Sequence, residues 1–477
     1  MNTIPLVVDL DGTLINTDML HESAIAAFRQ NPLVVFKILF WLTRGKAYLK
    51  ASLAKLTTIN AETLPYNQAF LAWLKSKKDE GRHIVLSTAS HSSYANAISK
   101  HLGVFDEVIS TEANVNLAGK HKSEALVTKY GKQAFDYAGN SYADLHVWEN
   151  ARNAIVVNAS LSLVKKTQAN FHVEKIFNKK KLSFKSIRHV FRFHQWLKNA
   201  LLFVPMLAAH QLTDYNTWIS LIIAFVSFSL CASAVYIGND LLDLNSDRLH
   251  PRKSSRPFAS GDVSIVVGVI LIPILLLTSG FLASFLNPDF MFWLVLYFIL
   301  TCAYSLYIKK VVLIDCMTLA VLYTIRIIAG AAAAVMSLSL WLLAFSIFIF
   351  FSLAFVKRYA ELNAHVLKDQ NLIHGRGYYT SDASLIQILG IASGYSALVI
   401  LALYLNSEAV LSLYENPKVI WAAIPIMLFW ISWVWIKAHR NEMNDDPLVF
   451  AVKDKTSLLA GLMLALVLFV GTVGLPW

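Results

Sequence analysis

The chain has 477 residues, of which 56% are hydrophobic and 15% charged, and its formal net charge is +11. This excess of apolar residues excludes a wholly soluble protein. The positive charge does not require nucleic acid, and we expect none as a partner, because membrane proteins gather Lys and Arg on cytoplasmic loops. The three cysteines lie in or beside apolar runs, which indicates neither a disulfide framework nor a metal site.

The apolar runs are concentrated in the second half of the chain. We therefore predict a multidomain protein in which a soluble α/β domain (1–160) and a basic linker (161–191) precede an all-α polytopic membrane domain (192–477). Runs long enough to cross about 30 Å of hydrocarbon predict about nine transmembrane helices. Their expected ranges are 196–211, 215–238, 262–285, 289–306, 312–334, 338–356, 384–405, 416–436 and 456–475.

The N-terminal segment Val7-Val8-Asp9-Leu10-Asp11-Gly12-Thr13 predicts a buried strand that ends in two acids. Two such carboxylates can divide the work of phosphoryl transfer, one attacking phosphorus and the other handling the proton, with Mg²⁺ bridging to the phosphate. A surface turn is the alternative, because Asp-Gly is a common turn pair. We expect no cleaved signal peptide, since the apolar segment runs straight into the acids.

Further predicted strands, alternating with helical segments, indicate a parallel α/β sheet with ligands at its carboxyl edge. The order of motifs resembles the haloacid dehalogenase (HAD) superfamily of phosphatases, a Rossmann-like fold with a helical cap, here about 17–80. The resemblance implies that Asp9 is the nucleophile and Asp11 the general acid/base. It further implies that Thr88 and Lys122 hold the phosphoryl oxygens and that the Mg²⁺ candidates are Asp9, Asp11, Asn140 and Asp144. An amide at Asn140, where the family usually has Asp, puts full activity in doubt.

Two other features of the soluble half concern the membrane. The cap contains an unusually apolar run from Pro32 to Leu42, interrupted only by Lys37. We hypothesise that this face touches the bilayer or the membrane domain. The linker is strongly basic, and we favour electrostatic attachment to anionic headgroups over guidance of an anionic substrate between sites.

The most informative stretch follows the apolar run that ends at Gly238. Asp240, Asp243 and Asp247 would share one face of a continuing helix, within an arc of about 60°. Three carboxylates on one face need a cation, and hard oxygen ligands suit Mg²⁺ with substrate phosphates. The stretch also offers Asn239 as a metal candidate and Arg248, Lys253 and Arg256 as phosphate ligands. The alternative is an ordinary polar loop.

Polar residues of later spans converge on the same predicted side of the membrane. The phosphate-binding candidates there are Lys198, Lys309, Arg326, Lys357 and Arg358, and Asp315 is a further acidic metal candidate. Arg326 has a structural alternative, an ion pair with Asp315. Lys357 and Arg358 have another, simple positive-inside anchoring. The asymmetry of Lys and Arg between loops predicts that the soluble domain and both active sites are cytoplasmic, at the inner membrane.

The membrane half resembles the UbiA-type prenyltransferase superfamily, through Asn239-Asp240-x-x-Asp243-x-x-x-Asp247. Lys357-Arg358-Tyr359-Ala360-Glu361-Leu362 and Asp445-Asp446-Pro447 resemble one branch, the decaprenyl-phosphate phosphoribosyltransferases. This resemblance implies Mg²⁺, one site in each domain, and the substrates phosphoribosyl pyrophosphate (PRPP) and polyprenyl phosphate. Catalysis would fall to Asp240, Asp243 and Asp247, and the HAD-like domain would remove the ribose 5-phosphate to give a lipid-linked pentose for an arabinan-type envelope glycan.

Two alternatives remain open at this point. A quinone-pathway aromatic prenyltransferase with an unrelated or regulatory HAD domain keeps the fold and changes both substrates. A membrane scaffold with a degenerate phosphatase-like domain is favoured by Asn140 and opposed by the intact Asp9 and Asp11. Neither chain length of the lipid nor oligomeric state follows from the residues, and a homo-oligomer is compatible with them.

Overall fold

The computed structural model describes residues 4–111, 117–180, 183–366, 377–411, 413–443 and 446–473. The chain divides into two compact units. The first comprises Met1–Phe191 with Ile237–Ile272, and the second comprises Arg192–Tyr236 with Pro273–Trp477. The first unit is thus discontinuous in sequence, because a membrane-domain segment belongs to it.

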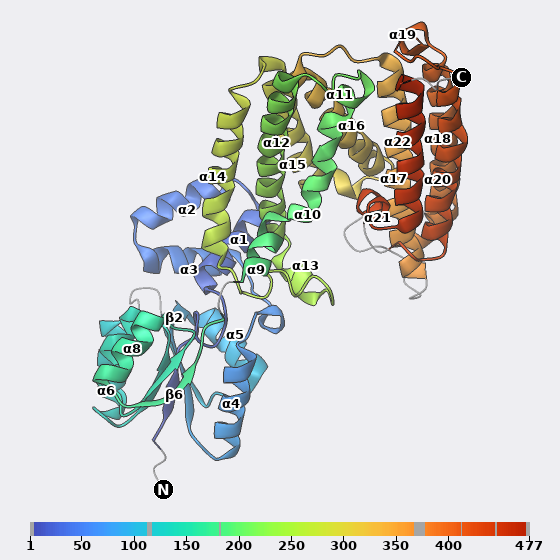
Figure 1. Cartoon of the computed structure of the whole chain (residues 1–477). Coiled ribbons are helices and arrows are strands. Elements are labelled where there is room, and N and C mark those ends of the chain that lie inside the picture. Colours follow the sequence, from blue (N-terminus) through green and yellow to red (C-terminus); the bar gives the residue numbers. More distant parts are fainter. Residues whose placement is uncertain are drawn as a thin grey trace. The chain divides into compact units, whose positions relative to one another are not determined.

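A six-stranded sheet of order β3-β2-β1-β4-β5-β6 forms the centre of the first unit (Figure 1). All the pairings are parallel, as the alternation of strands and helices predicts. The strands are β1 (Leu6–Val8), β2 (Ile84–His91), β3 (Glu107–Thr111), β4 (Asp136–Gly139), β5 (Ala154–Val157) and β6 (Val173–Phe177). Because β1 lies between β2 and β4, the loops after these three strands meet at one edge.

Helices cover both faces of this sheet (Figure 1). Leu6 and Val8 of β1 face a core that includes Phe70 of α4 and Ile98 of α5, whereas Val7 faces the opposite core. This alternation is the period-two pattern of a strand buried on both sides. The covering helices are α4 (Gln68–Asp79) and α5 (Ser92–Leu102) on one face, and α6 (Lys120–Tyr130), α7 (Leu145–Trp148) and α8 (Leu161–Asn170) on the other.

The predicted helical cap is inserted between β1 and α4. It consists of α1 (Met19–Gln30), α2 (Val34–Thr43), α3 (Lys46–Leu56) and η1 (Ala61–Thr63). Asp18 begins α1, since its side chain accepts a hydrogen bond from the Leu20 backbone N–H. The cap has a small core of its own around Ala27, Val34, Leu49 and Leu53.

The segment predicted as a linker begins inside the fold. Residues 161–177 form α8 and β6, and β6 completes the sheet beside β5. This strand was not predicted from the sequence, because 165–175 contains several basic residues. An edge strand exposed to solvent tolerates Lys and Glu. Only the residues after Phe177 connect the sheet to α9 (Phe184–Phe191).

The segment Ile237–Ile272 of the first unit includes the end of α12 (Tyr215–Leu242), α13 (Leu244–Leu249) and the start of α14 (Ile265–Ala283). Its loop comes close to the soluble fold at Gly261. A Cβ at Gly261 would lie 2.5 Å from the main-chain oxygen of Asn16, so only glycine fits there. Glycine also tolerates the positive φ of +75°.

The described residues contain eight helices long and apolar enough to cross a membrane. They confirm eight of the nine predicted spans. Their ranges are Tyr215–Leu242, Ile265–Ala283, Pro288–Leu306, Ile314–Ala334, Leu340–Ala364, Thr380–Leu405, Val419–His439 and Lys455–Val473. The chain is a multi-pass membrane protein.

The ninth predicted span, 196–211, is not one helix. It is divided into α10 (Phe193–Trp196), η3 (Leu197–Phe203) and α11 (Val204–Ala208), with Pro205 in the first turn of α11. Lys198 and Asn199 are buried here and hydrogen-bonded to other elements. Their polar contacts and the proline explain why the segment does not continue as a regular span.

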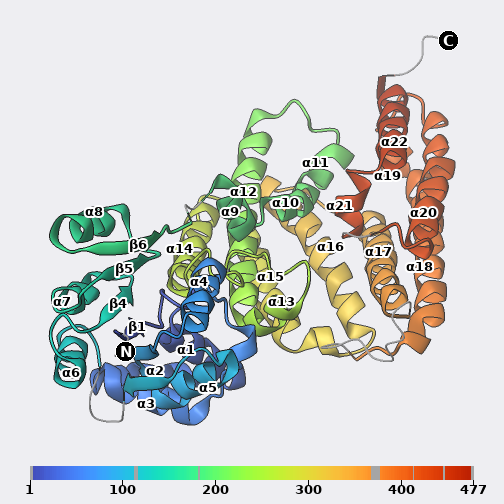
Figure 2. The same ribbon diagram turned by 90° about the horizontal axis from the view of Figure 1, so that it is seen from below.

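Successive spans of the second unit contact one another, α15 with α16, α16 with α17, α17 with α18, and α20 with both α18 and α22 (Figure 2). The long helices are α15 (Pro288–Leu306), α16 (Ile314–Ala334), α17 (Leu340–Val366), α18 (Ala383–Leu405), α20 (Ala423–His439) and α22 (Lys455–Val473). The shorter elements are η4 (Ile308–Lys310), η5 (Thr380–Asp382), α19 (Glu408–Leu411), η6 (Val419–Ala422) and α21 (Pro447–Ala451), and η2 (Tyr142–Asp144) belongs to the first unit.

Candidate active sites

The phosphatase-like site lies at the carboxyl edge of the sheet. Asp9 follows β1, Thr88 lies in β2, and Asn140 and Asp144 follow β4. Lys122 reaches the same edge from α6, where its Nζ donates hydrogen bonds to Asp9 Oδ1 (2.6 Å), the Ser87 carbonyl (3.1 Å) and the Tyr137 hydroxyl (3.0 Å). The structure therefore brings together the residues that the sequence predicts for this site.

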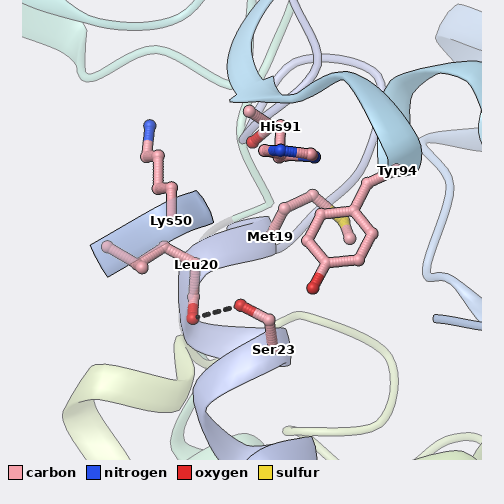
Figure 3. Close-up of a pocket in the computed structure, with 7 residues that line it drawn as sticks. Met19, Leu20, Ser23, Lys50, His91 and Tyr94 are labelled. Carbon is pink, nitrogen blue, oxygen red and sulfur yellow. Dashed lines mark hydrogen bonds between the residues drawn. The ribbon is translucent and has the colours of Figure 1, made fainter. Parts of the chain in front are cut away.

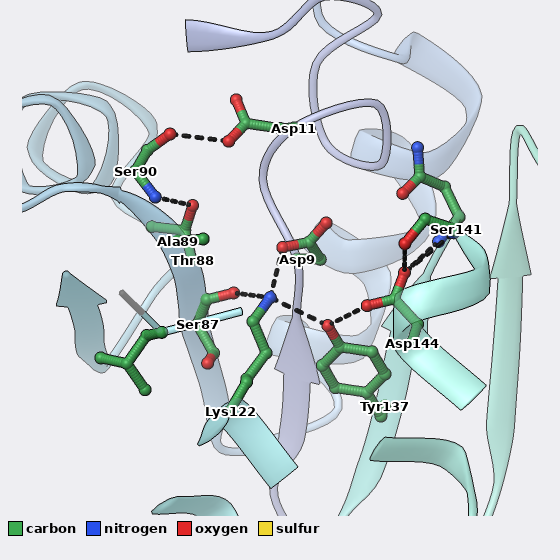
Figure 4. A network of polar contacts seen from close by, with 12 residues as sticks. Asp9, Asp11, Ser87, Thr88, Ala89, Ser90, Lys122, Tyr137, Ser141 and Asp144 are labelled. Atoms are coloured by element: carbon green, nitrogen blue, oxygen red, sulfur yellow. Dashed lines mark hydrogen bonds and ion pairs between the residues drawn. The ribbon is translucent and has the colours of Figure 1, made fainter. Parts of the chain in front are cut away.

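A continuous polar chain runs through Lys122 (Figure 4). The Tyr137 hydroxyl donates to Asp144 Oδ1 at 2.8 Å, which links Asp144 to Lys122 and Asp9. Burial raises the pKa of Asp9 to about 6, although Lys122 opposes this shift. Burial also opposes the charge of Lys122, but Asp9 and Asp144 outweigh it and raise the lysine pKa. One buried lysine thus balances the carboxylates at this edge.

Asp11 is held by neutral donors instead. Its Oδ1 accepts from the Met19 backbone N–H (2.8 Å) and its Oδ2 from the Ser90 hydroxyl (2.6 Å). Burial, with the negative charges of Asp18 and Asp9, raises the pKa of Asp11 to about 7. A carboxyl group that titrates near neutral pH is suited to general acid/base catalysis.

A small pocket adjoins Asp11 through Met19 and Ser90, both of which line it. Its other lining residues come from the cap helices α1 and α3, from the end of β2 and from α5, and Figure 3 shows Lys50 and His91 among them. The Lys50 Nζ donates to the Ala89 carbonyl at 2.7 Å. Lys50 and His91 thus place basic groups beside this small pocket.

Asp144 fastens the turn after β4. Its Oδ2 accepts from the backbone N–H groups of Asn140 (3.0 Å) and Ser141 (2.9 Å) and from the Ser141 hydroxyl (2.8 Å). These bonds and the one from Tyr137 fix the carboxylate in place, so the structure shows Asp144 positioning the turn and Lys122. Its predicted part in holding a metal stays a prediction.

The Asn140 side chain lies over the Asp9–Gly12 loop, because a Cβ at Gly12 would be 2.0 Å from Asn140 Nδ2. The Asp9 carboxylate and the Asn140 amide are therefore the metal-ligand candidates here, whereas the Asp11 carboxylate accepts from Met19 and Ser90. Carboxylate and amide oxygens are hard donors suited to Mg²⁺. In the described part of the chain, no three His, Cys, Asp or Glu side chains form a group able to hold a metal.

The acidic motif of the membrane domain has a different geometry. Asp240 lies in the last turn of α12 and Asp247 in α13, with Asp243 between the two helices. A single atom, Arg256 Nη1, lies 3.0 Å from Asp240 Oδ1 and 2.6 Å from Asp247 Oδ2. The two carboxylates thus converge as a shared face requires. Burial raises the pKa of Asp247, although Arg256 opposes the shift.

These two acids are close enough to share one cation, and their oxygens suit Mg²⁺ with phosphate oxygens as further ligands. Arg256, predicted to bind phosphate, occupies that position in the structure. Asp243 belongs to no three-acid group among the described residues, because the helix ends at Leu242 and restarts at Leu244. The backbone carbonyl of Asn239 accepts a hydrogen bond from the Asp243 backbone N–H.

Arg248, predicted to bind phosphate, contacts the cap in this structure. Its Nη2 and Nη1 donate to both carboxylate oxygens of Glu22 in α1, at 2.6 and 3.1 Å, and its Nε donates to the Ala259 carbonyl. Both side chains are buried. The Thr17 hydroxyl also donates to Glu22. The guanidinium is therefore committed to the cap. Lys253, by contrast, is exposed.

In the second unit, Asp446 forms ion pairs with Lys198 and Lys357, two of the residues predicted to bind phosphate. Its Oδ2 lies 2.7 Å from Lys198 Nζ and 3.5 Å from Lys357 Nζ, and the Tyr323 hydroxyl donates to it at 3.1 Å. Although burial opposes ionisation, Lys198 and Lys357 hold the pKa of Asp446 below its usual range. Asp446 was not among the predicted site residues. The stretch Asp445-Asp446-Pro447 was the sequence feature that could have identified it.

The remaining predicted groups of the second unit have protein partners. Arg358 is fully buried and pairs with Asp315 and Glu361. Asp315, predicted as a metal candidate, thus serves an ion pair. Arg326 donates to Asn199 Oδ1 (2.9 Å) and to the Tyr297 hydroxyl (3.0 Å) rather than pairing with Asp315. Lys309 lies in η4.

An α/β phosphatase-like fold joined to a polytopic helical unit defines a membrane enzyme with two candidate active sites. Residues 200–458 match the model of the UbiA prenyltransferase family, and residues 6–148 match that of the haloacid dehalogenase-like hydrolases. The chain belongs to the UbiA prenyltransferase family, and it carries an N-terminal HAD-like domain. Both domains therefore agree with the resemblances found in the sequence.

Three curated relatives extend this comparison. Uncharacterized protein y4nM of Sinorhizobium fredii is 35% identical over 97% of this chain and 90% of its own length. Nodulation protein NoeC of Azorhizobium caulinodans is 36% identical over 60% of this chain and 93% of its own. Decaprenyl-phosphate phosphoribosyltransferase of Mycobacterium tuberculosis is 37% identical over 36% of this chain and 58% of its own.

Proposed function

We propose that this enzyme transfers 5-phosphoribose from PRPP to polyprenyl phosphate and then removes the 5-phosphate. The observation that carries the proposal is the fusion itself. A relative named decaprenyl-phosphate phosphoribosyltransferase suggests a product that still bears a phosphomonoester. A phosphatase-like site with Asp9, Asp11 and Lys122 in place would act on such a product, whereas a prenylated aromatic product would offer it no substrate.

The transfer step would use the Asp240 and Asp247 face. Mg²⁺ held by these acids, with Asp243 as a further candidate, would neutralise charge on the departing pyrophosphate. Arg256 would turn from the acids to the diphosphate, and Lys253 would face it from the exposed loop. An oxygen of polyprenyl phosphate would attack C1 of the ribose as the bond from C1 to pyrophosphate breaks. No protein nucleophile is needed, because the attacking phosphate oxygen is already anionic.

The hydrolytic step would use the sheet edge. Asp9 would attack the phosphorus of the 5-phosphate while Asp11 gives its proton to the departing ribose oxygen. Thr88 and Lys122 would hold the phosphoryl oxygens. Water would then attack the aspartyl-phosphate, with Asp11 taking a proton, and inorganic phosphate would leave. Asp9 and Asn140 would hold Mg²⁺, which when bound would draw charge from the phosphoryl group, and the neutral amide would hold the metal more weakly than a carboxylate.

The location proposed for both sites is the cytoplasmic side of the inner membrane. Lys and Arg are concentrated in the loops on the side of the motif, which is the side expected to stay in the cytoplasm. The basic residues before α9 would lie against anionic headgroups. PRPP, a soluble anion, would then reach the acidic motif from the cytoplasm.

The test is incubation of the purified full-length protein with labelled PRPP, polyprenyl phosphate and Mg²⁺, followed by mass analysis of the lipid fraction. We expect lipid-linked ribose without its 5-phosphate. Lipid-linked phosphoribose alone would support the transferase and remove the proposed hydrolysis. Absence of any lipid-linked pentose, with a polyprenyl diphosphate and an aromatic acid reacting instead, would overturn the proposal in favour of prenyl transfer.

A further inference from the structure

Helix α2 of the cap is apolar around its circumference except at Lys37 and at the terminal Thr43. Val34, Ile38 and Trp41 pack into the small cap core with Ala27 and Leu53. The opposite side, which we call the outer face of α2, consists of Leu33, Val35, Phe36, Leu39, Phe40 and Leu42, all exposed. Phe36 is 68% and Leu39 58% exposed. A helix at a water-facing surface carries polar residues on its solvent side. The outer face of α2 is therefore suited to contact with an apolar partner rather than with water.

The charge around α2 has one sign. Residues 31–61 contain Lys37, Arg44, Lys46, Lys50 and Lys55 and no Asp or Glu. The Arg44 guanidinium lies over the rings of Phe40 (4.7 Å) and Tyr48 (5.4 Å), so its charge borders the apolar face. A covering that is apolar inside and anionic at its edge complements both features, and a bilayer with acidic headgroups has that structure.

The position of α2 within the first unit supports the same covering. Helix α1, three residues before α2, lies against the end of the candidate span α12, where Ile25 and Arg29 line a groove with Leu241 and Leu242. The buried pair of Glu22 with Arg248 fixes this contact. The cap is therefore attached where a span leaves the hydrocarbon. The ten residues of α2 rise about 15 Å, too short to cross about 30 Å.

We propose that α2 is an interfacial helix that lies in the bilayer surface, with its outer face among the acyl chains and Lys37, Arg44 and Lys46 at anionic headgroups. The pocket beside Asp11 is lined by α1 and α3 of the same cap, whose core includes α2. Anchoring α2 would hold this opening at headgroup level, where a phosphomonoester on a lipid is presented. That last consequence rests on the proposed function, and the anchoring does not.

The test places a nitroxide at Leu39→Cys in full-length protein, in nanodiscs that contain phosphatidylglycerol. Cys231, Cys302 and Cys316 are first replaced by alanine, and size-exclusion chromatography confirms a monodisperse protein. Glu124→Cys, exposed on α6, is the matched control. We expect oxygen to relax the Leu39 label more than a water-soluble nickel chelate does, at a depth of about 5–10 Å, and the reverse at Glu124.

Two results would overturn the anchoring. A Leu39 label as open to the nickel chelate as the Glu124 label would show that the outer face of α2 stays in water. A label protected from both reagents would show that protein covers it, either a second copy or another part of this chain. Neither result depends on which reaction the enzyme catalyses, so failure of the proposed function remains distinguishable.

A second variant tests the consequence for activity. Phe36→Glu, Leu39→Glu and Phe40→Glu together change only exposed side chains, and Leu161→Glu, also exposed, is the control. We expect hydrolysis of a soluble aryl phosphate to stay unchanged in both. Hydrolysis of a phosphomonoester on a lipid in vesicles should fall only in the triple variant. Equal rates on the lipid substrate would refute a role of α2 in presentation.

Discussion

Asp9 and its partner Lys122 are 113 residues apart in sequence, whereas Asp247 and Arg256 are nine apart. The sheet edge therefore obtains its balancing charge from a distant helix that the fold holds in place. The acidic motif obtains it from its own loop. The difference teaches that the first site is fixed by global topology, while the second is balanced by a local side chain that a metal and its diphosphate could replace.

The strongest test of this contrast is Asp9→Asn. We expect hydrolysis of the 5-phosphate and of a soluble aryl phosphate to fall on the order of 10⁴-fold or more, because the proposed nucleophile is lost. Transfer from PRPP should continue, so lipid-linked phosphoribose accumulates in the mass spectrum. Glu149→Gln, exposed in the same domain, is the control. Loss of both reactions would show that the two sites are not separable.

The converse test is Asp247→Asn. Removing one of the two converging carboxylates should lower transfer about 10²- to 10³-fold, the scale of losing one electrostatic contact in a transition state, with aryl phosphate hydrolysis retained. Asp262→Asn, in the loop after α13 and paired with exposed Lys180 at 3.4 Å, serves as the control. Equal transfer by wild type and Asp247→Asn would remove this motif from the mechanism.

The connection between the regions can be broken at Glu22→Gln. Arg248 would remain buried while the negative charge of its partner is lost, which lowers the free energy of unfolding by about 3 kcal/mol. The first unit should therefore unfold at a lower temperature. The exchange of Glu22→Arg with Arg248→Glu should recover part of the loss. Recovery is partial because the hydrogen bonds from Thr17 to Glu22 and from Arg248 to the Ala259 carbonyl are lost in the exchange. Thermal unfolding measures both, and an unchanged midpoint in Glu22→Gln would contradict the coupling.

The smallest expected effect concerns Asn140→Asp. A carboxylate in place of the amide beside Gly12 adds a charged oxygen donor. We expect the Mg²⁺ concentration for half-maximal aryl phosphate hydrolysis to fall about tenfold, measured by metal titration. Asn96→Asp, a control of the same chemistry at an exposed position of α5, should leave the titration unchanged. A higher Mg²⁺ requirement would place the metal away from residue 140.

The sheet edge was predictable because each residue lies in or just after its own strand. Asp9, Thr88 and Asn140 needed only the rule that parallel strands share a carboxyl edge. The contacts of Arg248 were not predictable, since Glu22 is 226 residues away and nothing local favours it over phosphate. The same holds for Asp446, which gathers Lys198 from 248 residues away. The broken helix at 193–208 followed from tertiary polar contacts, which override an apolar composition.

The discontinuity of the first unit has a practical consequence for dividing the protein. Cutting the chain at the basic segment before α9 would leave behind Ile237–Ile272 and strip the cap of Arg248. A fragment ending at that segment would carry an uncompensated Glu22 and an open surface at Asn16, where Gly261 belongs. The two proposed activities are therefore better separated by point substitution than by truncation. A fusion of the N-terminal domain to another protein would have to include the loop of Ile237–Ile272 as well as the domain.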